Sequence, residues 1–198
     1  NEKFQFIKHD IFERLTSKIE IDKIWHLACP ASPNIYQRDP IKTIRINYEG
    51  TLNILNLAKI HKSRMLFTST SEVYGITRTI PQRENMPILL STCSPRACYS
   101  EGKRIAETLI NSFRETNKLD IKIARVFNTY GPRLNIEDGR VIGNFIKQCL
   151  KEKNLTIYGD GNQTRSFCYV SDLIEGLIKL MKSNNSYPIN IGNDEFNN

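Results

Sequence analysis

The chain has 198 residues, 39% hydrophobic and 25% charged, so it can form an ordinary globular core; its apolar runs are far shorter than the roughly 18 residues that span a membrane. Its net charge of +7 comes from scattered Lys and Arg residues, and no nucleic-acid-binding motif accompanies them. Its five cysteines contain no C-x-x-C pair and its three histidines lack metal-ligand spacing, so we expect neither a metal site nor a disulfide framework.

Short β-branched or aromatic runs alternate with longer helical patterns in the first part of the chain. The short runs predict strands over residues 4–8, 24–28, 65–69 and 121–126. Apolar residues at helical spacing predict helices over 41–60 and 99–116. This alternation is typical of βαβ units on a parallel sheet whose strands are buried on both faces. We therefore expect an α/β fold with a doubly wound parallel sheet.

The pattern changes after Gly131-Pro132. We expect a helix over 141–151, short strands over 155–158, 165–169 and 189–191, and a further helix after Val170-Ser171-Asp172. Ser171 or Asp172 is expected to cap that helix, because both side chains can accept a hydrogen bond from its first turn. These shorter elements predict a smaller second lobe.

A G-x-x-G-x-x-G loop is absent from the sequence. In an open α/β sheet that binds a dinucleotide, this loop lies in the first βα turn. Two interpretations follow: the fold does not bind a dinucleotide, or the first strands of its sheet are missing. The second interpretation makes the chain a fragment of a longer protein.

Two segments carry side chains that suit acid–base chemistry. Residues 68–75 (TSTSEVYG) follow a predicted strand, at the carboxyl end where doubly wound sheets place their sites. Tyr99 and Lys103 share one face of a predicted helix. A cation beside a phenol lowers its pKa, so Tyr99 can take a proton from a sugar hydroxyl during oxidation of the same carbon. The alternative is a Tyr and a Lys on an exposed helix face, since Y-x-x-x-K alone is common.

Further motifs extend this pattern over almost the whole chain. They are residues 26–33 (HLACPASP), Asn47 with 50–53 (GTLN), 70–75 (TSEVYG), 95–104 (PRACYSEGKR), 124–133 (ARVFNTYGPR), 138–141 (DGRV), 158–167 (YGDGNQTRSF) and 169–172 (YVSD). With these motifs the chain resembles the extended short-chain dehydrogenase/reductases that act on nucleotide sugars, and within them the UDP-glucuronate decarboxylases. The resemblance implies a Rossmann-like sheet. Residues 1–130 would form a partial NAD-binding domain without its first βαβ unit, and 131–198 a partial UDP-sugar-binding lobe interleaved with it.

The reaction implied by this resemblance uses NAD and UDP-glucuronate. C4 of the sugar is oxidised, the resulting β-keto acid loses CO2, and the ketone is reduced again to give UDP-xylose. Sugar 4,6-dehydratases carry Asp-Glu where this chain has Ser71-Glu72, and 4-epimerases usually lack the Glu, so these residues favour decarboxylation. A dehydratase, an epimerase and an inactive paralogue that only binds a partner are the alternatives. The fragment by itself is expected to be inactive.

The resemblance also implies roles for individual residues. Tyr99 would be the base, Lys103 would support it and hold the nicotinamide ribose, and Thr70 would supply a neighbouring hydroxyl. Ser71 and Glu72 would contact the sugar near C5. The cofactor would further contact Asp10, Ile11, Leu27, Ala28, Thr68, Phe127, Thr129 and Arg140, and the substrate would contact Asn128, Asn144, Tyr158 and Arg165. Core packing is the alternative for the apolar members, and a surface salt bridge is the alternative for Arg165.

Members of this family commonly form homodimers through two long helices, here 41–60 and 99–116. Packing of the same helices on the sheet explains their apolar faces equally well. We expect no nucleic-acid partner. The expected compartment is the cytoplasm, or the Golgi lumen if a membrane anchor precedes this chain.

Overall fold

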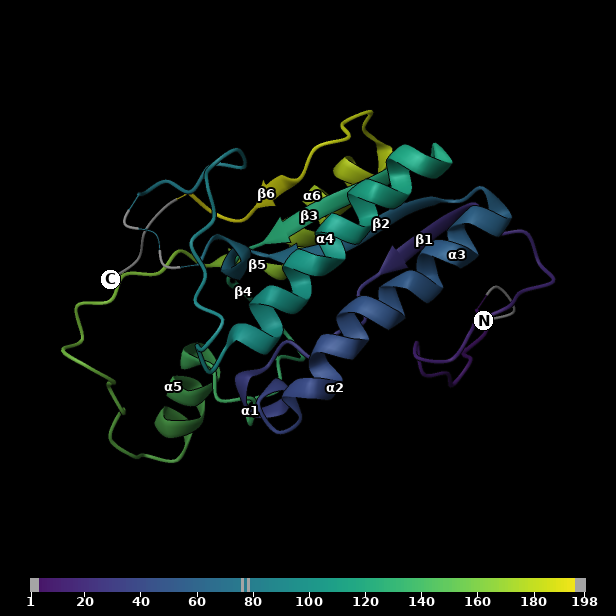
Figure 1. The fold of residues 1–198 in the computed structure, drawn as a ribbon. Helices are drawn as coiled ribbons and strands as arrows, with labels where there is room; N and C mark the ends of the chain where they lie inside the picture. Colours follow the sequence, from purple (N-terminus) through teal and green to yellow (C-terminus); the bar gives the residue numbers. More distant parts are fainter. Residues whose placement is uncertain (1–3, 76, 78, 195–198) are drawn as a thin grey trace.

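The computed structural model describes residues 4–75, 77 and 79–194 (Figure 1). A parallel sheet has the strand order β1-β2-β3-β6. The strands are Lys23–His26 (β1), Arg64–Thr70 (β2), Ile121–Val126 (β3) and Ile189–Ile191 (β6). The expected α/β fold with a Rossmann-like parallel sheet is therefore confirmed. The strand predicted over 24–28 ends at His26, which leaves Leu27 and Ala28 in the following loop.

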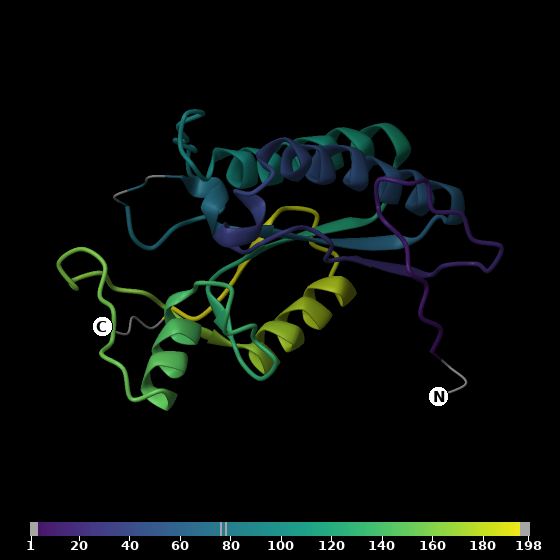
Figure 2. The same ribbon diagram turned by 90° about the horizontal axis from the view of Figure 1, so that it is seen from below.

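Helices cover both faces of the sheet. One face carries a long helix, made of α2 (Pro40–Arg45), the π-helical turn η1 (Ile46–Gly50) and α3 (Thr51–His61), and beside it α4 (Ala97–Asn117). The opposite face carries α6 (Val170–Lys182), as Figure 2 shows. The helices predicted over 41–60 and 99–116 are confirmed, the first with a π-helical turn inside it. None of the described helices is long and apolar enough to cross a membrane.

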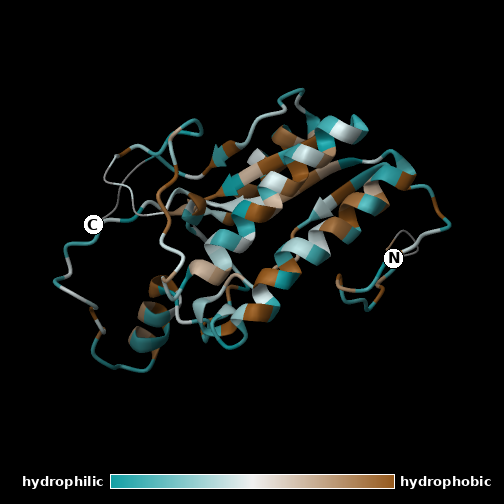
Figure 3. Ribbon diagram, viewed as in Figure 1, coloured by the Kyte–Doolittle hydropathy of each residue, from teal (hydrophilic) through white to brown (hydrophobic). Residues whose placement is uncertain are grey.

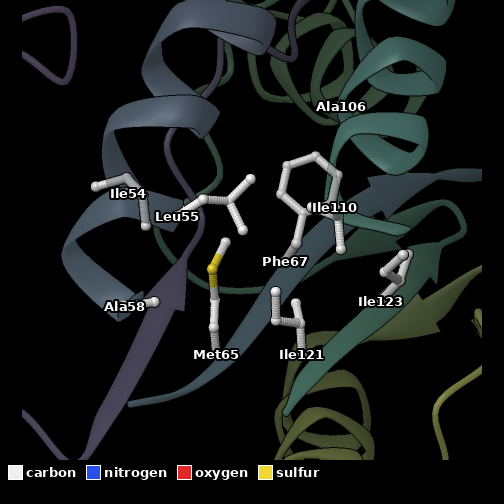
Figure 4. Close-up of a cluster of buried hydrophobic side chains, with 9 residues drawn as sticks. All are labelled: Ile54, Leu55, Ala58, Met65, Phe67, Ala106, Ile110, Ile121 and Ile123. Carbon is white, nitrogen blue, oxygen red and sulfur yellow. The ribbon is translucent and has the colours of Figure 1, made fainter. Parts of the chain in front are cut away.

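The hydrophobic core lies on both faces of β2 and β3, which explains their continuous apolar runs. The cluster toward α3 and α4 is drawn in Figure 4 and consists of Ile54, Leu55, Ala58, Met65, Phe67, Ala106, Ile110, Ile121 and Ile123. Toward α6, the cluster consists of Leu66, Ala124, Leu177, Leu180 and Met181. Burial of one large apolar side chain contributes about 1.5–3 kcal/mol. The first cluster therefore fixes α4 against β2, which positions the candidate catalytic residues.

A tight turn follows β2. Thr70 caps the 3₁₀ helix η2 (Ser71–Tyr74), because its Oγ1 accepts a hydrogen bond from the Glu72 N–H at 3.2 Å. Gly75 then adopts a φ of +68°, and a Cβ at this position would lie 1.9 Å from the Leu89 carbonyl oxygen. Only glycine fits this turn without displacing the backbone. The turn keeps Ser71 and Glu72 at the carboxyl end of the sheet.

Residues 4–8 do not form the predicted strand, and Phe4, Phe6 and Ile7 are exposed. In a doubly wound sheet of order 3-2-1-4-5-6, the third strand pairs only with the second. The described residues contain no strand that pairs with 4–8. The prediction was wrong because an apolar run becomes a strand only where a neighbouring strand satisfies its backbone groups.

Outside the four-stranded sheet lie α5 (Val141–Leu150) and a short parallel pair, β4 (Thr129–Tyr130) with β5 (Cys168–Tyr169). The elements α6 and β6, which the sequence placed in a smaller second lobe, instead pack on and extend the main sheet. The helix predicted over 141–151 is confirmed. The strand predicted over 155–158 is not formed, because the Thr156 N–H donates to the Gln148 side chain at 3.1 Å instead of to another strand. The strand predicted over 165–169 is limited to the two residues of β5.

The N-cap of α6 also differs from the prediction. Tyr169 occupies the N-cap position with extended backbone angles, and no side chain caps the helix. The Ser171 hydroxyl donates to the Asp172 carboxylate at 3.1 Å within the first turn. Pairing of Tyr169 in β5 fixes where the helix begins, which places both predicted capping residues inside it.

Candidate active site

The candidate site lies at the carboxyl end of β2, against the first turns of α4. Tyr99 is 7% exposed and its side chain forms a hydrogen bond with that of Thr70. Lys103 follows one helical turn later and is 3% exposed. The Tyr–Lys spacing therefore belongs to a buried pair that faces the strand, and the alternative of an exposed helix face is excluded.

The end of β2 holds the ammonium group of Lys103. Its Nζ donates to the Thr68 carbonyl at 2.7 Å and lies 4.5 Å from the centre of the Phe67 ring. Burial is the main cause that lowers the pKa of Lys103. An ammonium group has three donors, so further donors of Lys103 are available to a ribose or to the phenol of Tyr99.

A neutral histidine lies near this cation. His26 is 4% exposed, and its Nε2 is 3.0 Å from the Thr51 hydroxyl. Burial, and then the charge of Lys103, lowers the pKa of His26 to about 3. His26 therefore adds no positive charge to the site at neutral pH.

The pKa of Tyr99 differs from the expectation. Burial raises it above the usual value of a tyrosine, and the hydrogen bond with Thr70 opposes this change only in part. The expected lowering by Lys103 is not found, because the ammonium group is bound to the Thr68 carbonyl. Tyr99 is a protonated phenol here at neutral pH, so its use as a base requires a closer cation.

A second buried tyrosine stacks on Tyr99. Tyr36 ends the short helix α1 (Pro33–Tyr36), and the two rings are 4.9 Å apart and inclined by 5°. Tyr36 is fully buried, yet its hydroxyl has no hydrogen-bond partner among the described residues. Burial, followed by the charge of Glu72, raises its pKa to about 12. This hydroxyl can bind a polar group of a substrate. The sequence motifs assigned Tyr36 no role.

Glu72 is paired across the site with Arg96. Arg96 Nη1 lies 3.3 Å from Glu72 Oε1. Burial raises the pKa of Glu72, and the charge of Arg96 opposes that change. Sequence reasoning gave Arg96 no role, although its place in the PRACYSEGKR motif, just before Tyr99, was a signal.

Most of the residues expected to contact the cofactor lie along the carboxyl edge of the sheet. Leu27 and Ala28 follow β1 and are exposed, and Thr68 lies near the end of β2. Phe127 and Thr129 follow β3. Because β1, β2 and β3 are parallel neighbours, these residues share one edge. Exposed Leu27 and Ala28, together with half-buried Phe127, offer apolar contacts to the flat ring of a nicotinamide nucleotide.

Two of the residues expected to contact the cofactor, Asp10 and Ile11, lie in a loop that is docked on α3. Asn53 Nδ2 donates to the carbonyls of Ile11 and Phe12, both at 2.9 Å. Ile11 packs on Gly50, where a Cβ would lie 2.4 Å from Ile11 Cδ1. The Asp10 carboxylate accepts the Phe12 N–H at 3.1 Å. The helix thus fixes Asp10 and Ile11, and Asn53 is a positioning residue that the sequence left without a role.

Arg140 lies in a loop that reaches back to the residues after β1. Its guanidinium is paired with the Asp138 carboxylate. The Ser32 hydroxyl donates to the Asp138 carbonyl at 2.8 Å, which fixes the loop. Asn144, one of the predicted substrate residues, donates to the Gly139 carbonyl at 3.0 Å. The structure therefore brings Arg140 and Asn144 together on one loop and helix end.

The other predicted substrate residues are less closely grouped. Asn128 Nδ2 donates to the Ser166 carbonyl at 3.3 Å. Tyr158 and Arg165 are exposed, in a segment between α5 and β5 that extends away from the sheet (Figures 1 and 2). Within the described part of the chain, no hydrogen bond or ion pair joins either residue to Tyr99. Their contact with a substrate stays a prediction.

Curated proteins with similar sequences include several UDP-glucuronic acid decarboxylases. UDP-glucuronic acid decarboxylase 3 of Arabidopsis thaliana is 54% identical over 191 residues, which are 96% of this chain and 55% of that protein. UDP-glucuronic acid decarboxylase 1 of Xenopus tropicalis is 50% identical over 98% of this chain and 46% of that protein. The chain thus spans about half the length of the curated relatives it matches.

Solved structures with the same fold include NAD-bound enzymes. UDP-glucuronic acid 4-epimerase from Bacillus cereus, in complex with UDP-glucuronic acid and NAD, has a TM-score of 0.82 and 31% identity; the match covers 100% of this chain and 62% of that one. UDP-N-acetylglucosamine 4-epimerase from Methanobrevibacter ruminantium has a TM-score of 0.85 and 30% identity over 96% of this chain and 61% of that one. The model of the NAD dependent epimerase/dehydratase family matches residues 2–192, which confirms NAD as the expected cofactor. Because this match extends over nearly the whole chain, the chain belongs to the NAD dependent epimerase/dehydratase family.

Proposed function

We propose that the full-length protein is a UDP-glucuronate decarboxylase that forms UDP-xylose and CO2. The observation that carries this proposal is the Thr70-Ser71-Glu72 segment held beside Tyr99 at the end of β2. Ser71 stands where a dehydratase needs an acid for the leaving hydroxyl, and a serine is a poor acid. Identities of 50–54% with proteins named UDP-glucuronic acid decarboxylase support the same conclusion.

NAD, when bound, supplies the oxidation of C4 and the later reduction of the ketone. Thr70 and Tyr99 hold the C4 hydroxyl by hydrogen bonds, and Tyr99 accepts its proton. Lys103 lies on the same helix face and stabilises the phenolate when its ammonium group turns toward it. Burial of this pair excludes water, which protects the ketone formed at C4.

The same site serves the loss of CO2. The oxidised sugar acid is a β-keto acid, so the electrons of the broken C5–carboxylate bond pass to the C4 carbonyl. A proton must then be added at C5. Burial raises the pKa of Glu72, so this carboxyl group can hold that proton near neutral pH better than an exposed one. Arg96 fixes the carboxyl group by their ion pair.

Product analysis of the full-length protein tests this proposal. With NAD+ and UDP-glucuronate labelled in the carboxyl carbon, we expect labelled CO2 and, by NMR, UDP-xylose. Ser71→Asp should reduce CO2 release, because it places a second acid beside Glu72. Ser91→Asp, the same change at an exposed position, is the matched control and should leave release unchanged. Absence of labelled CO2 from the wild-type reaction would reject the proposal.

A second candidate function is 4-epimerisation of the same substrate. The observation that favours it is the structural match to the Bacillus cereus UDP-glucuronic acid 4-epimerase, with a TM-score of 0.82. An epimerase would retain the carboxylate and invert C4. The NMR spectrum of the product therefore separates the two functions in a single reaction.

We also propose that the enzyme is a homodimer joined through the outer side of its long helix and of α4. Ile41, Ile44, Tyr48 and Ile105 are large apolar residues on these helices and are exposed. Figure 3 shows hydrophobic residues interspersed with hydrophilic ones along both helices. A second copy would cover them in a four-helix arrangement. Light scattering should report a dimer that Ile105→Glu converts to a monomer. Ile157→Glu, in the exposed segment after α5, should leave the dimer intact.

A further inference from the structure

A buried ion pair lies behind the candidate site. Arg125 in β3 and Glu107 in α4 are 5% and 6% exposed. Arg125 Nη2 lies 2.8 Å from Glu107 Oε2, and its Nε lies 3.1 Å from Glu107 Oε1. The pairing is therefore bidentate, and both charged groups are removed from water.

The pair is connected to the strand that carries the catalytic groups. Ser69 is the register partner of Arg125 between β2 and β3, and its hydroxyl donates to Glu107. Ser69 stands between Thr68, which accepts the Lys103 ammonium group, and Thr70, which bonds to Tyr99. Glu107 itself lies one helical turn after Lys103. The end of β2 that contacts Lys103 and Tyr99 is thus bonded to a carboxylate of α4, the helix that carries both residues.

The pair is connected equally to the segment that carries Ser71 and Glu72. Arg125 Nη1 donates to the Tyr74 hydroxyl at 2.9 Å and to the Glu84 carbonyl at 3.1 Å. The Tyr74 hydroxyl donates onward to Asn190 Oδ1 in β6 at 2.6 Å. Tyr74 is the last residue of η2, the helix that begins with Ser71 and Glu72.

Such a pair is weak evidence for stability, because removing two charges from water offsets most of their attraction. A fully hydrogen-bonded buried network does, however, fix the relative positions of the elements that it joins. All four nitrogen–oxygen contacts of Arg125 are used in this way. The network therefore joins α4 and the end of β2, which hold the Tyr99–Lys103 pair, to η2, which carries Ser71 and Glu72. None of the groups that it bonds belongs to the candidate site residues.

We infer that Glu107, Arg125 and Tyr74 are positioning residues that set the separation between the Tyr99–Lys103 pair and the Ser71–Glu72 segment. The inference rests on the proposed function in one respect: both halves must act on one sugar ring. A lysine at position 125 keeps the charge but cannot reproduce the planar fork. A phenylalanine at position 74 keeps the ring and the Arg125–Glu107 ion pair, and it removes the bonds of the hydroxyl to Arg125 and to Asn190 in β6.

The test compares Arg125→Lys and Tyr74→Phe in the full-length enzyme with Lys122→Met. Lys122 is the matched control: it lies in the same strand, is 2% exposed and pairs with Asp120. Asp120 keeps a second partner, Arg64, at 2.6 Å. The measurements are the melting temperature, the KM for UDP-glucuronate, and the rate of NADH formation at 340 nm in a single turnover.

We expect Arg125→Lys to slow NADH formation by about a hundredfold and Tyr74→Phe by about tenfold, on the scale of a misplacement near 1 Å. KM should change by less than about threefold. Lys122→Met should stay within about twofold of the wild-type rate, even if its melting temperature falls as much as those of Arg125→Lys and Tyr74→Phe. The inference is overturned if the rates of the two site variants fall no further than that of Lys122→Met, or if KM alone changes.

This comparison is independent of the product formed. Oxidation at C4 is common to decarboxylases, dehydratases and epimerases of this kind, so NADH formation reads the geometry in each case. If the wild-type protein forms NADH but no CO2, the proposed function fails and the positioning role is still measured. If CO2 is formed and the variants match the control, the positioning role alone fails.

Discussion

Replacing Tyr36 by Phe should stabilise the folded protein and weaken substrate binding. Its hydroxyl is buried without a partner among the described residues. Phe keeps the ring that stacks on Tyr99 at 4.9 Å. An unpaired buried polar group costs about 1–3 kcal/mol, so we expect a gain of about 1 kcal/mol in the free energy of unfolding. For a domain of this size, that gain raises the melting temperature by about 2–4 °C.

Tyr74→Phe provides the matched comparison, because its hydroxyl has two partners, Arg125 at 2.9 Å and Asn190 at 2.6 Å. The same chemical change should there lower the free energy of unfolding by about 1–2 kcal/mol. Scanning calorimetry of both full-length variants measures whether each change raises or lowers the stability of the protein. A Tyr36→Phe protein less stable than the wild type would refute the reasoning that this hydroxyl is unpaired.

The effect of Tyr36→Phe on binding is a separate measurement. A hydrogen bond to a ligand contributes about 0.5–1.5 kcal/mol, which corresponds to a loss of about two- to tenfold in affinity for UDP-glucuronate. Isothermal titration calorimetry in the presence of NAD+ measures it. Unchanged affinity would show that the Tyr36 hydroxyl does not contact the substrate.

Three further changes test the fold around the site. Between pH 6.5 and about 3, His26 is protonated in the unfolded chain but not in the folded protein, so the free energy of unfolding falls with decreasing pH by up to about 1.4 kcal/mol per pH unit. His26→Gln should reduce this pH dependence in urea unfolding at pH 4.5–7. An unaltered pH dependence would contradict the lowered pKa of His26. Gly75→Ala should lose at least about 2 kcal/mol, since its Cβ would lie 1.9 Å from a carbonyl oxygen, whereas Gly161→Ala, with 3.3 Å to its nearest neighbour, should lose less. Leu55→Ala, at a fully buried position, should lose about 2–5 kcal/mol; a loss below about 1 kcal/mol, by the same urea titration, would contradict its place in the core.

The sequence identified strands best where both faces are buried. The predicted bounds of the strand over 121–126 agree with those of β3, which pairs with β2 on one side and β6 on the other. Residues 4–8 have a similar apolar composition but lie exposed. In 155–158, a side-chain amide of α5 satisfies the backbone N–H of Thr156. Whether an apolar run pairs depends on neighbours that its own residues do not encode.

The same limit applies to the candidate site. Tyr99 and Lys103 were predictable as a pair, because helical spacing places them on one face. The ion pair of Arg96 with Glu72, and the stacking of Tyr36 on Tyr99, join different elements and carry no local signal. Family motifs identified the candidate site residues but not the contacts that position them.

Burial acts on Tyr99 and Lys103 in opposite directions: it raises the pKa of the phenol and lowers that of the ammonium group. Both charged forms are therefore disfavoured while the two groups stay apart. Direct contact opposes both effects at once, because phenolate and ammonium stabilise each other. Here the ammonium group is bound to the Thr68 carbonyl, next to the residue that is bonded to Glu107. In the proposed mechanism, the strength of Tyr99 as a base therefore depends on how the end of β2 is held against α4, and not on the identity of Tyr99 alone.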